Sequence, residues 1–265
     1  MDELRWQSSI FEINRLDEPD KQALYRTLLP EWVYTDYGID RTTLTAEGKP
    51  VVRFRCPSGS RAVEIMVRRR ASDQDPMLYL NMVDTFNHQL LVLLVVINNP
   101  ESPRYNIDQD EDGNVTQLGT ITRNREAEEA ALKAGLAPGQ VRAGLRVFKQ
   151  VVPIFEQFVA NMGHDMFFIE PLAYHNAIIF ERYGFSYVRG FQEMQRIHRE
   201  FLPGGELNRK LTPESPFRQP DAGESIRGRS WAIHDGILGH PYTGFQMYKR
   251  LGIHAGVTTF PNGRW

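Results

Sequence analysis

The sequence predicts a mixed α/β fold built on a twisted sheet, and three observations lead to it. Apolar and polar residues alternate over residues 51–67 and 78–82, which is typical of half-buried strands. A continuous apolar run of strand length follows at residues 90–97 and indicates a fully buried central strand. Later segments alternate between helical and strand periodicity, which predicts a mixed sheet with helices on both faces.

The N-terminal part is expected to form a helix followed by a hairpin. Residues 19–29 carry apolar side chains at helical spacing, and Pro30 ends that pattern. Residues 57–60 (PSGS) are turn formers between two alternating segments, which predicts a β-hairpin over residues 51–67. Residues 78–82 alternate in the same way and form the predicted third strand, ahead of the buried strand at 90–97.

Two helices are predicted in the middle of the chain. Residues 98–114 are acidic and rich in turn formers, and residues 115–122 (VTQLGTIT) are predicted as a strand. Residues 124–136 are predicted as a helix that ends near Gly135. Between Gln140 and Met162 apolar residues recur every three or four positions, which predicts a long helix. Pro153 should kink this helix or split it, and Gly163 should end it.

The C-terminal part divides into a short α/β segment and an extension. Residues 166–172 are predicted as a strand, residues 173–185 as a helix and residues 186–190 as a strand. Residues 203–230 contain many Pro, Gly and Ser residues and are predicted to be a connecting arm. We therefore divide the chain into a domain with a helical lead-in at residues 1–202 and an extension at residues 203–265. The aromatic residues of the last 35 positions should pack on the core, with a contact between copies in a homo-oligomer as the alternative.

Composition narrows the range of functions. The chain has 265 residues with 31 Lys and Arg and 33 Asp and Glu, a formal net charge of −2, so nothing attracts it as a whole to nucleic acid or to an anionic membrane. Cys56 is the single cysteine, which favours a reducing compartment. The N-terminal residues are not typical of a signal peptide, and the longest apolar run is too short for a transmembrane helix. We expect a cytoplasmic protein with neither nucleic acid nor a membrane as its partner.

One stretch carries a family resemblance. It begins with QVRAGL at residues 140–145, continues through the predicted helix to Gly163 and the apolar strand MFFIEPL, and ends with Asn176 and Gly184-Phe185. In order and spacing it resembles the core of the GNAT-type acyl-CoA N-acyltransferase superfamily. The resemblance implies that the family's fold is present and that acetyl-CoA or another acyl-CoA is the cofactor. The acceptor would be an amine on a small molecule or a peptide.

The resemblance also implies functional residues. In the family the loop before the long helix holds the CoA pyrophosphate through backbone N–H groups. The corresponding cofactor-binding residues here are Gln140, Val141, Arg142, Ala143, Gly144, Leu145 and Asn176. Arg142 and Arg146, one turn apart on the predicted helix, would suit phosphate. Glu170 could act as the base and Tyr183 as the acid, because Phe180 occupies the position of the family's usual Tyr.

Other interpretations stay open. Ala143 and Leu145 replace small residues that the family prefers, which favours a related but non-catalytic protein that binds a ligand or a partner. Glu170 could equally face water or pair with an arginine. A third hypothesis is a calcium-organised protein, because the sequence from residue 108 matches the first eight positions of a calcium loop, although Gly119 stands where a closing Glu is usual. Its metal ligands would be Asp108, Asp110, Asp112 and Asn114. An acidic turn explains the same residues.

Overall fold

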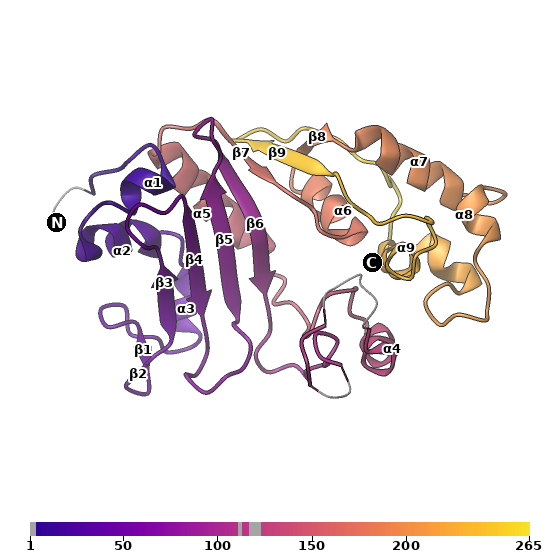
Figure 1. Ribbon diagram of the computed structural model, residues 1–265, viewed down its shortest axis with the longest axis horizontal. Helices are drawn as coiled ribbons and strands as arrows, with labels where there is room; N and C mark the ends of the chain where they lie inside the picture. Colours follow the sequence, from indigo (N-terminus) through magenta and orange to yellow (C-terminus); the bar gives the residue numbers. More distant parts are fainter. Residues whose placement is uncertain (1–3, 111–112, 117–122) are drawn as a thin grey trace. The chain divides into compact units, whose positions relative to one another are not determined.

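The structure is a computed structural model that describes residues 4–110, 113–116 and 123–265 (Figure 1). The chain forms two compact units, and each of them combines segments that are far apart in the sequence. The first unit consists of Met1–Pro100, Gly144–Glu170 and Tyr248–Ile253. The second unit consists of Glu101–Ala143, Pro171–Met247 and His254–Trp265.

A mixed sheet confirms the predicted α/β class. Its described strands follow the order β3-β4-β5-β6-β7-β9-β8, and β3 to β6 form antiparallel neighbours while β7 is parallel to β6. A separate pair, β1 (Thr45–Ala46) and β2 (Lys49–Pro50), is antiparallel. The strands of the main sheet are β3 (Val52–Arg55), β4 (Ala62–Val67), β5 (Leu78–Asp84), β6 (Leu90–Ile97), β7 (Met166–Ile169), β8 (Ser186–Arg189) and β9 (Gln246–Arg250).

Helices of the first unit bury one face of the sheet. They are α1 (Ile10–Ile13), α2 (Glu18–Arg26), α3 (Glu31–Thr35) and α5 (Phe148–Asn161). Along β4 and β5 alternate side chains are buried, and the intervening ones are only half-buried, as the period of two requires. Tyr25 of α2 and Phe158 of α5 are buried and stack on each other with ring centroids 6.3 Å apart. Aromatic packing between α2 and α5 therefore forms part of this core.

The segment Tyr248–Ile253 completes the first unit. Lys249 is buried, and its Nζ lies 2.9 Å from Glu156 Oε1 on α5. The backbone N–H of Leu251 donates to the carbonyl of Asp165, just before β7, over 2.9 Å. A part of the chain close to its end is thus built into a unit that begins with the N-terminal residues.

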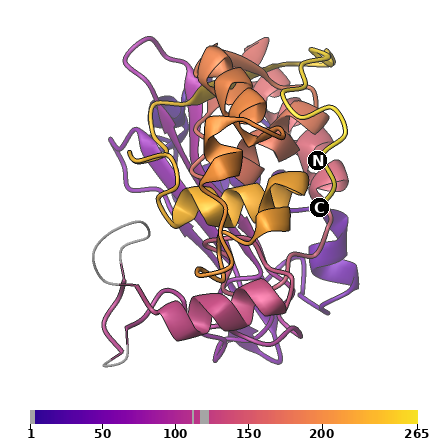
Figure 2. The same cartoon turned by 90° about the vertical axis from the view of Figure 1, so that its right-hand side faces the viewer.

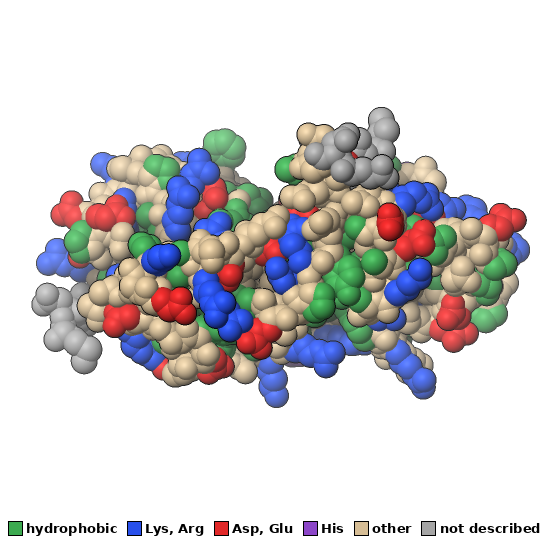
Figure 3. Space-filling view, turned by 90° about the horizontal axis from the view of Figure 1, so that it is seen from below, with side chains coloured by type: hydrophobic (Ala, Val, Ile, Leu, Met, Phe, Trp, Pro, Cys, Tyr) green, Lys and Arg blue, Asp and Glu red, His purple; other side chains and the backbone are tan. Residues whose placement is uncertain are grey.

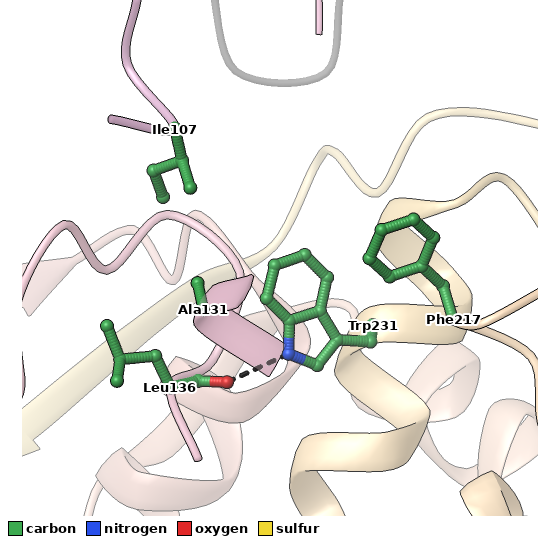
Figure 4. Packing of buried hydrophobic residues seen from close by; sticks show 5 residues of the cluster. All are labelled: Ile107, Ala131, Leu136, Phe217 and Trp231. Carbon is green, nitrogen blue, oxygen red and sulfur yellow. Dashed lines mark hydrogen bonds between the residues drawn. The ribbon is translucent and has the colours of Figure 1, made fainter. Parts of the chain in front are cut away.

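The second unit is mainly helical, with α4 beside α9 (Figure 2). Trp231 of α9 is fully buried among Ile107, Ala131, Leu136 and Phe217, and its indole Nε1 donates to the Leu136 carbonyl over 2.8 Å (Figure 4). The helices of this unit are α4 (Arg125–Lys133), α6 (Tyr174–Arg182), α7 (Phe191–Phe201), α8 (Glu206–Arg209), the 3-10 helix η1 (Pro220–Glu224) and α9 (Ile226–His234).

The final segment folds back onto the second unit through two buried polar contacts. Glu181 accepts hydrogen bonds from the N–H and the hydroxyl of Thr259, over 2.8 and 2.7 Å. Arg229 lies 3.6 Å from the ring centroid of Phe260, and its Nε donates to the Gly223 carbonyl. Of the aromatic side chains expected to pack on the core, Trp231, Phe245 and Phe260 are buried.

Three expectations about regular structure are wrong. The long helix begins at Phe148 and not at Gln140, and it is not split at Pro153. The strand at residues 90–97 lies centrally but is not fully buried, because Leu94 is 39% exposed. The expected connecting arm contains α8, η1 and most of α9, because Ser225 caps α9 and Trp231 anchors it. Most of the strand predicted at 115–122 lies outside the described residues.

The surface agrees with the balanced composition. On the face shown in Figure 3, Lys and Arg side chains are interspersed with Asp and Glu side chains. Among the described residues, no helix combines the length and the apolar character needed to cross a membrane.

Candidate functional site

The strands β6 and β7 separate soon after they meet. Their parallel pairing consists of Leu91 with Phe168 and Val92 with Ile169. β7 then ends, whereas β6 continues to Ile97, and the two ribbons diverge in Figure 1. From Leu93 to Ile97, the edge of β6 that faces away from β5 therefore has no partner strand among the described residues. Such an edge presents backbone N–H and C=O groups to a ligand.

A β-bulge in β6 marks the point of separation. Asn81 pairs with Leu94 and Met82 pairs with Val92, so Leu93 is an extra residue on β6. A bulge bends its strand and increases the local twist, and it changes the direction of the neighbouring backbone groups. The bulge follows directly after the last parallel pair, and it therefore contributes to the fork between β6 and β7.

The N-terminus of α5 follows a loop that lies against the end of β6. A Cβ atom on Gly144 would meet the Ile97 carbonyl oxygen at 3.3 Å, so the two backbones are close. α5 begins four residues later at Phe148, and its N-cap residue Val147 makes no side-chain hydrogen bond to the helix. The helix N-terminus and the carboxyl end of β6 thus lie in the same region of the first unit.

Positive charge gathers at this helix N-terminus. The first turn of α5 contains no acidic residue, and Arg146 and Lys149 are exposed on either side of the N-cap. Cations oppose the helix dipole at this end, whereas an anion there is stabilised by both the dipole and the side chains. Arg146 also has a φ of 59°, in the left-handed region that non-glycine residues seldom adopt. This arrangement is suited to a phosphate-bearing ligand.

Glu170 lies at the fork. It follows Ile169, which is the last residue of β7 that pairs with β6, and its side chain is half-buried. The bulged residue Leu93 occupies the equivalent position after Val92 on β6. A carboxylate at this point can accept a proton from a group bound between the separated strands.

Most of the predicted phosphate loop is used for internal contacts of the second unit. Gln140 accepts a hydrogen bond from the Ala137 N–H, and the carbonyl of Val141 accepts one from the Tyr105 N–H over 2.8 Å. Arg142 donates to the Ser102 carbonyl, and the Ala143 N–H donates to the Ser102 hydroxyl. Arg142 and Arg146 do not lie one helical turn apart, because both precede α5. In the first unit the loop contributes Gly144 and Leu145.

Two other predicted residues lie on α6 of the second unit. Asn176 is in the first turn of that helix, where its N–H donates to the Ala173 carbonyl over 3.0 Å. Tyr183 is the C-cap residue, and its N–H bonds to carbonyls of the last turn. Both side chains are half-buried.

The acidic loop has internal partners. Asp108 forms an ion pair with Arg104 over 2.7 Å, and Asp110 accepts hydrogen bonds from the backbone and side-chain amides of Asn114. Asp112 lies outside the described residues. Within the described part of the chain, no three His, Cys, Asp or Glu residues are grouped so that they could hold a metal ion.

The second unit contains a buried ionic network that the sequence did not reveal. The carboxylate of Asp235 forms ion pairs with Arg123 at 2.9 Å and with Arg218 at 2.7 Å. The carboxylate of Glu128 pairs with both Arg123 and His234. Burial alone would raise the pKa of Glu128, but the hydrogen bonds from His234 and Arg123 outweigh it and lower the pKa. Because each carboxylate of this network is paired, the network offers no unpaired carboxylate for a ligand.

His175 and Ser230 form a second buried pair. Nδ1 of His175 lies 2.8 Å from the Ser230 hydroxyl, and the two residues are 4% and 1% exposed. Burial, with a smaller effect from His234, lowers the pKa of His175 to about 3, so the imidazole is neutral at neutral pH. Ser230 lies inside α9 and cannot be reached by a substrate, so the pair joins α6 to α9 as a structural contact.

Comparison with known proteins identifies no relative: no family model, no curated protein and no solved structure matches the chain. The fork at β6 and β7 therefore has to be interpreted from its own geometry. Its central feature is the bulge at Leu93, and the sequence around it contains no Gly or Pro that would have indicated a bulge. Lys149 was also missed, because the predicted helix began eight residues too early.

Proposed function

We propose that the protein is an acyl-CoA-dependent N-acyltransferase that acylates an amine. The observation that carries the proposal is the fork between β6 and β7, with a bulge on β6 and an uncapped, cationic helix N-terminus at its end. The family that residues 140–185 resemble also has two neighbouring strands that part where the pantetheine lies. The parallel β6–β7 pair in an otherwise antiparallel neighbourhood supports the same proposal.

The first unit offers a binding group for each part of the cofactor. The unpaired edge of β6, from Leu93 to Ile97, would hydrogen-bond the amides of pantetheine in the manner of an added strand. The N-terminus of α5 would receive the pyrophosphate, with Arg146 and Lys149 supplying charge. In this proposal the pyrophosphate is therefore bound at the N-terminus of α5 and not by the predicted loop at residues 140–145.

The reaction follows from this placement. The amine nitrogen attacks the thioester carbonyl, a carbon–nitrogen bond forms, the carbon–sulfur bond breaks, and the thiolate leaves. Backbone N–H groups at the bulge of β6 would stabilise the developing oxyanion. Glu170, at the fork, is the proposed base that takes the ammonium proton. Tyr183, the acid that the resemblance implies, lies in the second unit, so the placement in the first unit assigns it no part in this reaction.

Calorimetric titration with acetyl-CoA tests the binding site. We expect micromolar affinity for the unmodified chain and at least tenfold weaker binding in R146E and in K149E, a loss of about 1.4 kcal/mol or more. K49E is the matched control, because Lys49 is exposed in β2 and the charge change is the same. The absence of heat and of a thermal shift at millimolar acetyl-CoA would overturn the proposal.

Transfer itself requires a second assay. Release of free thiol from acetyl-CoA is followed with a panel of amines, and E170Q should lower kcat while leaving acetyl-CoA binding unchanged, because a base acts only in the chemical step. Tight acetyl-CoA binding without turnover of any amine would favour the non-catalytic alternative.

A further inference from the structure

Arginine and phenylalanine side chains alternate on the surface of the first unit, beside α1. Two guanidinium groups lie near the ring of Phe11, with Arg15 Cζ at 5.7 Å and Arg61 Cζ at 5.5 Å from its centroid. Arg61 Cζ also lies 6.0 Å from the centroid of the Phe86 ring. A guanidinium group at about this distance is attracted to the ring. We call this set of four residues, Arg15, Phe11, Arg61 and Phe86, the arginine–phenylalanine ladder.

The ladder is open to solvent and ends in a fully presented ring. Phe86 lies between β5 and β6 and is 93% exposed, so the fold gains almost no burial from it. Arg15 and Arg61 are exposed as well, and Phe11 is half-buried. Phenylalanine and arginine are both enriched in protein–protein interfaces. The composition and the exposure of the ladder are thus those of a binding surface.

Hydrogen bonds fix the position of the exposed ring. In the loop that carries Phe86, the Thr85 N–H donates to the Gln89 carbonyl over 2.8 Å, and the Gln89 N–H donates to the Thr85 hydroxyl over 3.1 Å. Asp84, the last residue of β5, accepts a hydrogen bond from the Phe11 N–H over 2.7 Å and so ties the loop to α1 (Figure 1). A surface that is ordered before binding loses less conformational entropy when a partner arrives.

The two arginines keep their positive charge available. Among the described residues neither Arg15 nor Arg61 has a carboxylate partner, and the hydrogen bond of Arg61 goes to the Thr85 carbonyl over 3.4 Å. The one acid of α1, Glu12, accepts hydrogen bonds from the N–H and the hydroxyl of Ser8, over 3.1 and 2.8 Å. The ladder is therefore complementary to a partner with negative charge.

We propose that the arginine–phenylalanine ladder binds an acidic segment of a partner protein that also carries an aromatic side chain. Carboxylates of the segment would pair with Arg15 and Arg61, and its aromatic ring would pack on Phe86. Nucleic acid fits the surface less well, because its affinity comes from many neutralised phosphates and Glu12 would repel them. This inference goes beyond the proposed acyl transfer and does not depend on it.

Fluorescence anisotropy with labelled peptides tests the chemistry of the partner. The probe is a short peptide of aspartate and glutamate around one central tryptophan. One control peptide has asparagine and glutamine in place of the acids, and the other has glycine in place of the tryptophan. We expect submillimolar affinity for the probe and at least tenfold weaker binding of both controls, because charge and ring contact each contribute.

Three results of this titration would overturn the inference. They are the absence of probe binding at millimolar concentration, equal affinity for the probe and either control peptide, and tighter binding of a labelled single-stranded oligothymidylate than of the probe. The last of these would assign the surface to nucleic acid.

Variants of the ladder locate the binding site. F86A removes the exposed ring and R61E reverses the charge beside it, so we expect each to weaken binding of the probe at least tenfold. R53E is the matched control, because Arg53 is exposed on β3 of the same unit and the charge change is the same. It should leave the affinity unaltered, and all three variants should keep the melting temperature of the unmodified chain, because the side chains are exposed. If F86A and R61E bind the probe as tightly as the unmodified chain, or if R53E weakens binding as much as R61E, the ladder is not the site and the inference fails.

Discussion

At the scale of single residues, His175 makes the stability of the protein depend on pH. Its folded-state pKa of about 3 lies below the value near 6.5 of an unfolded chain, because burial disfavours the charged imidazole. Between these two pKa values, the imidazole is therefore protonated in the unfolded state and neutral in the folded state. The contribution to stability is complete above pH 6.5 and falls as the pH decreases from there towards 3.

Urea unfolding at several pH values between 5 and 7, followed by tryptophan fluorescence, measures this effect. We expect the free energy of unfolding to decrease on acidification by up to about 1.4 kcal/mol per pH unit from this one group. H175Q keeps a polar group near Ser230 but does not titrate, so its free energy should fall less steeply. A constant difference between the two proteins over this range would contradict the prediction.

At the scale of elements, α5 carries a conflict between stability and ligand binding. Gln150 is exposed in the first turn, where an acid would interact favourably with the helix dipole. We expect Q150E to stabilise the protein by about 0.3–1 kcal/mol and to weaken acetyl-CoA binding, because the new carboxylate repels the pyrophosphate. Q157E, the same change in a later turn of the helix, should leave the affinity unaltered. Thermal melting and calorimetry on the two variants provide the comparison.

The elements also show how far the sequence can be interpreted. The antiparallel strands β3, β4 and β5 follow from their period of two, and α4 follows from its Asn124 cap and apolar spacing. Helical periodicity continues upstream to Val141, but the helix begins only at Phe148. The carbonyl of Val141 and the N–H of Ala143 form hydrogen bonds with Tyr105 and Ser102, and not with a helical turn. Such long-range contacts leave no local pattern.

Site residues were harder to predict for the same reason. Glu170 was named from its place near the end of the strand predicted at residues 166–172, and in the structure it directly follows the shorter β7. The bulge at Leu93 stands out only once strand register is known, because a leucine within an apolar run is unremarkable in a sequence. Strand register is a property of the three-dimensional structure.

At the scale of the whole molecule, the last residues of the chain are part of a folded unit. Thr259 donates two hydrogen bonds to the buried carboxylate of Glu181, and the Phe260 ring packs on the guanidinium of Arg229, so removing residues 257–265 would remove these contacts. A hydrogen bond to a charged group contributes about 1.5–3 kcal/mol. We therefore expect this deletion to lower the melting temperature strongly in a thermal scan. Deletion of Trp265 alone, whose side chain is 44% exposed, should have a small effect.

The return of Tyr248–Ile253 to the first unit affects how the protein folds during synthesis. The antiparallel strands β3 to β6 are made first, and the segment that bonds to Glu156 and Asp165 follows β6 by about 150 residues. At about 5–20 residues per second, the intervening chain takes roughly 8 to 30 seconds to synthesise. Until then the sheet lacks β9, the neighbour of β7, so the nascent chain displays an open sheet edge to which chaperones on the ribosome can bind.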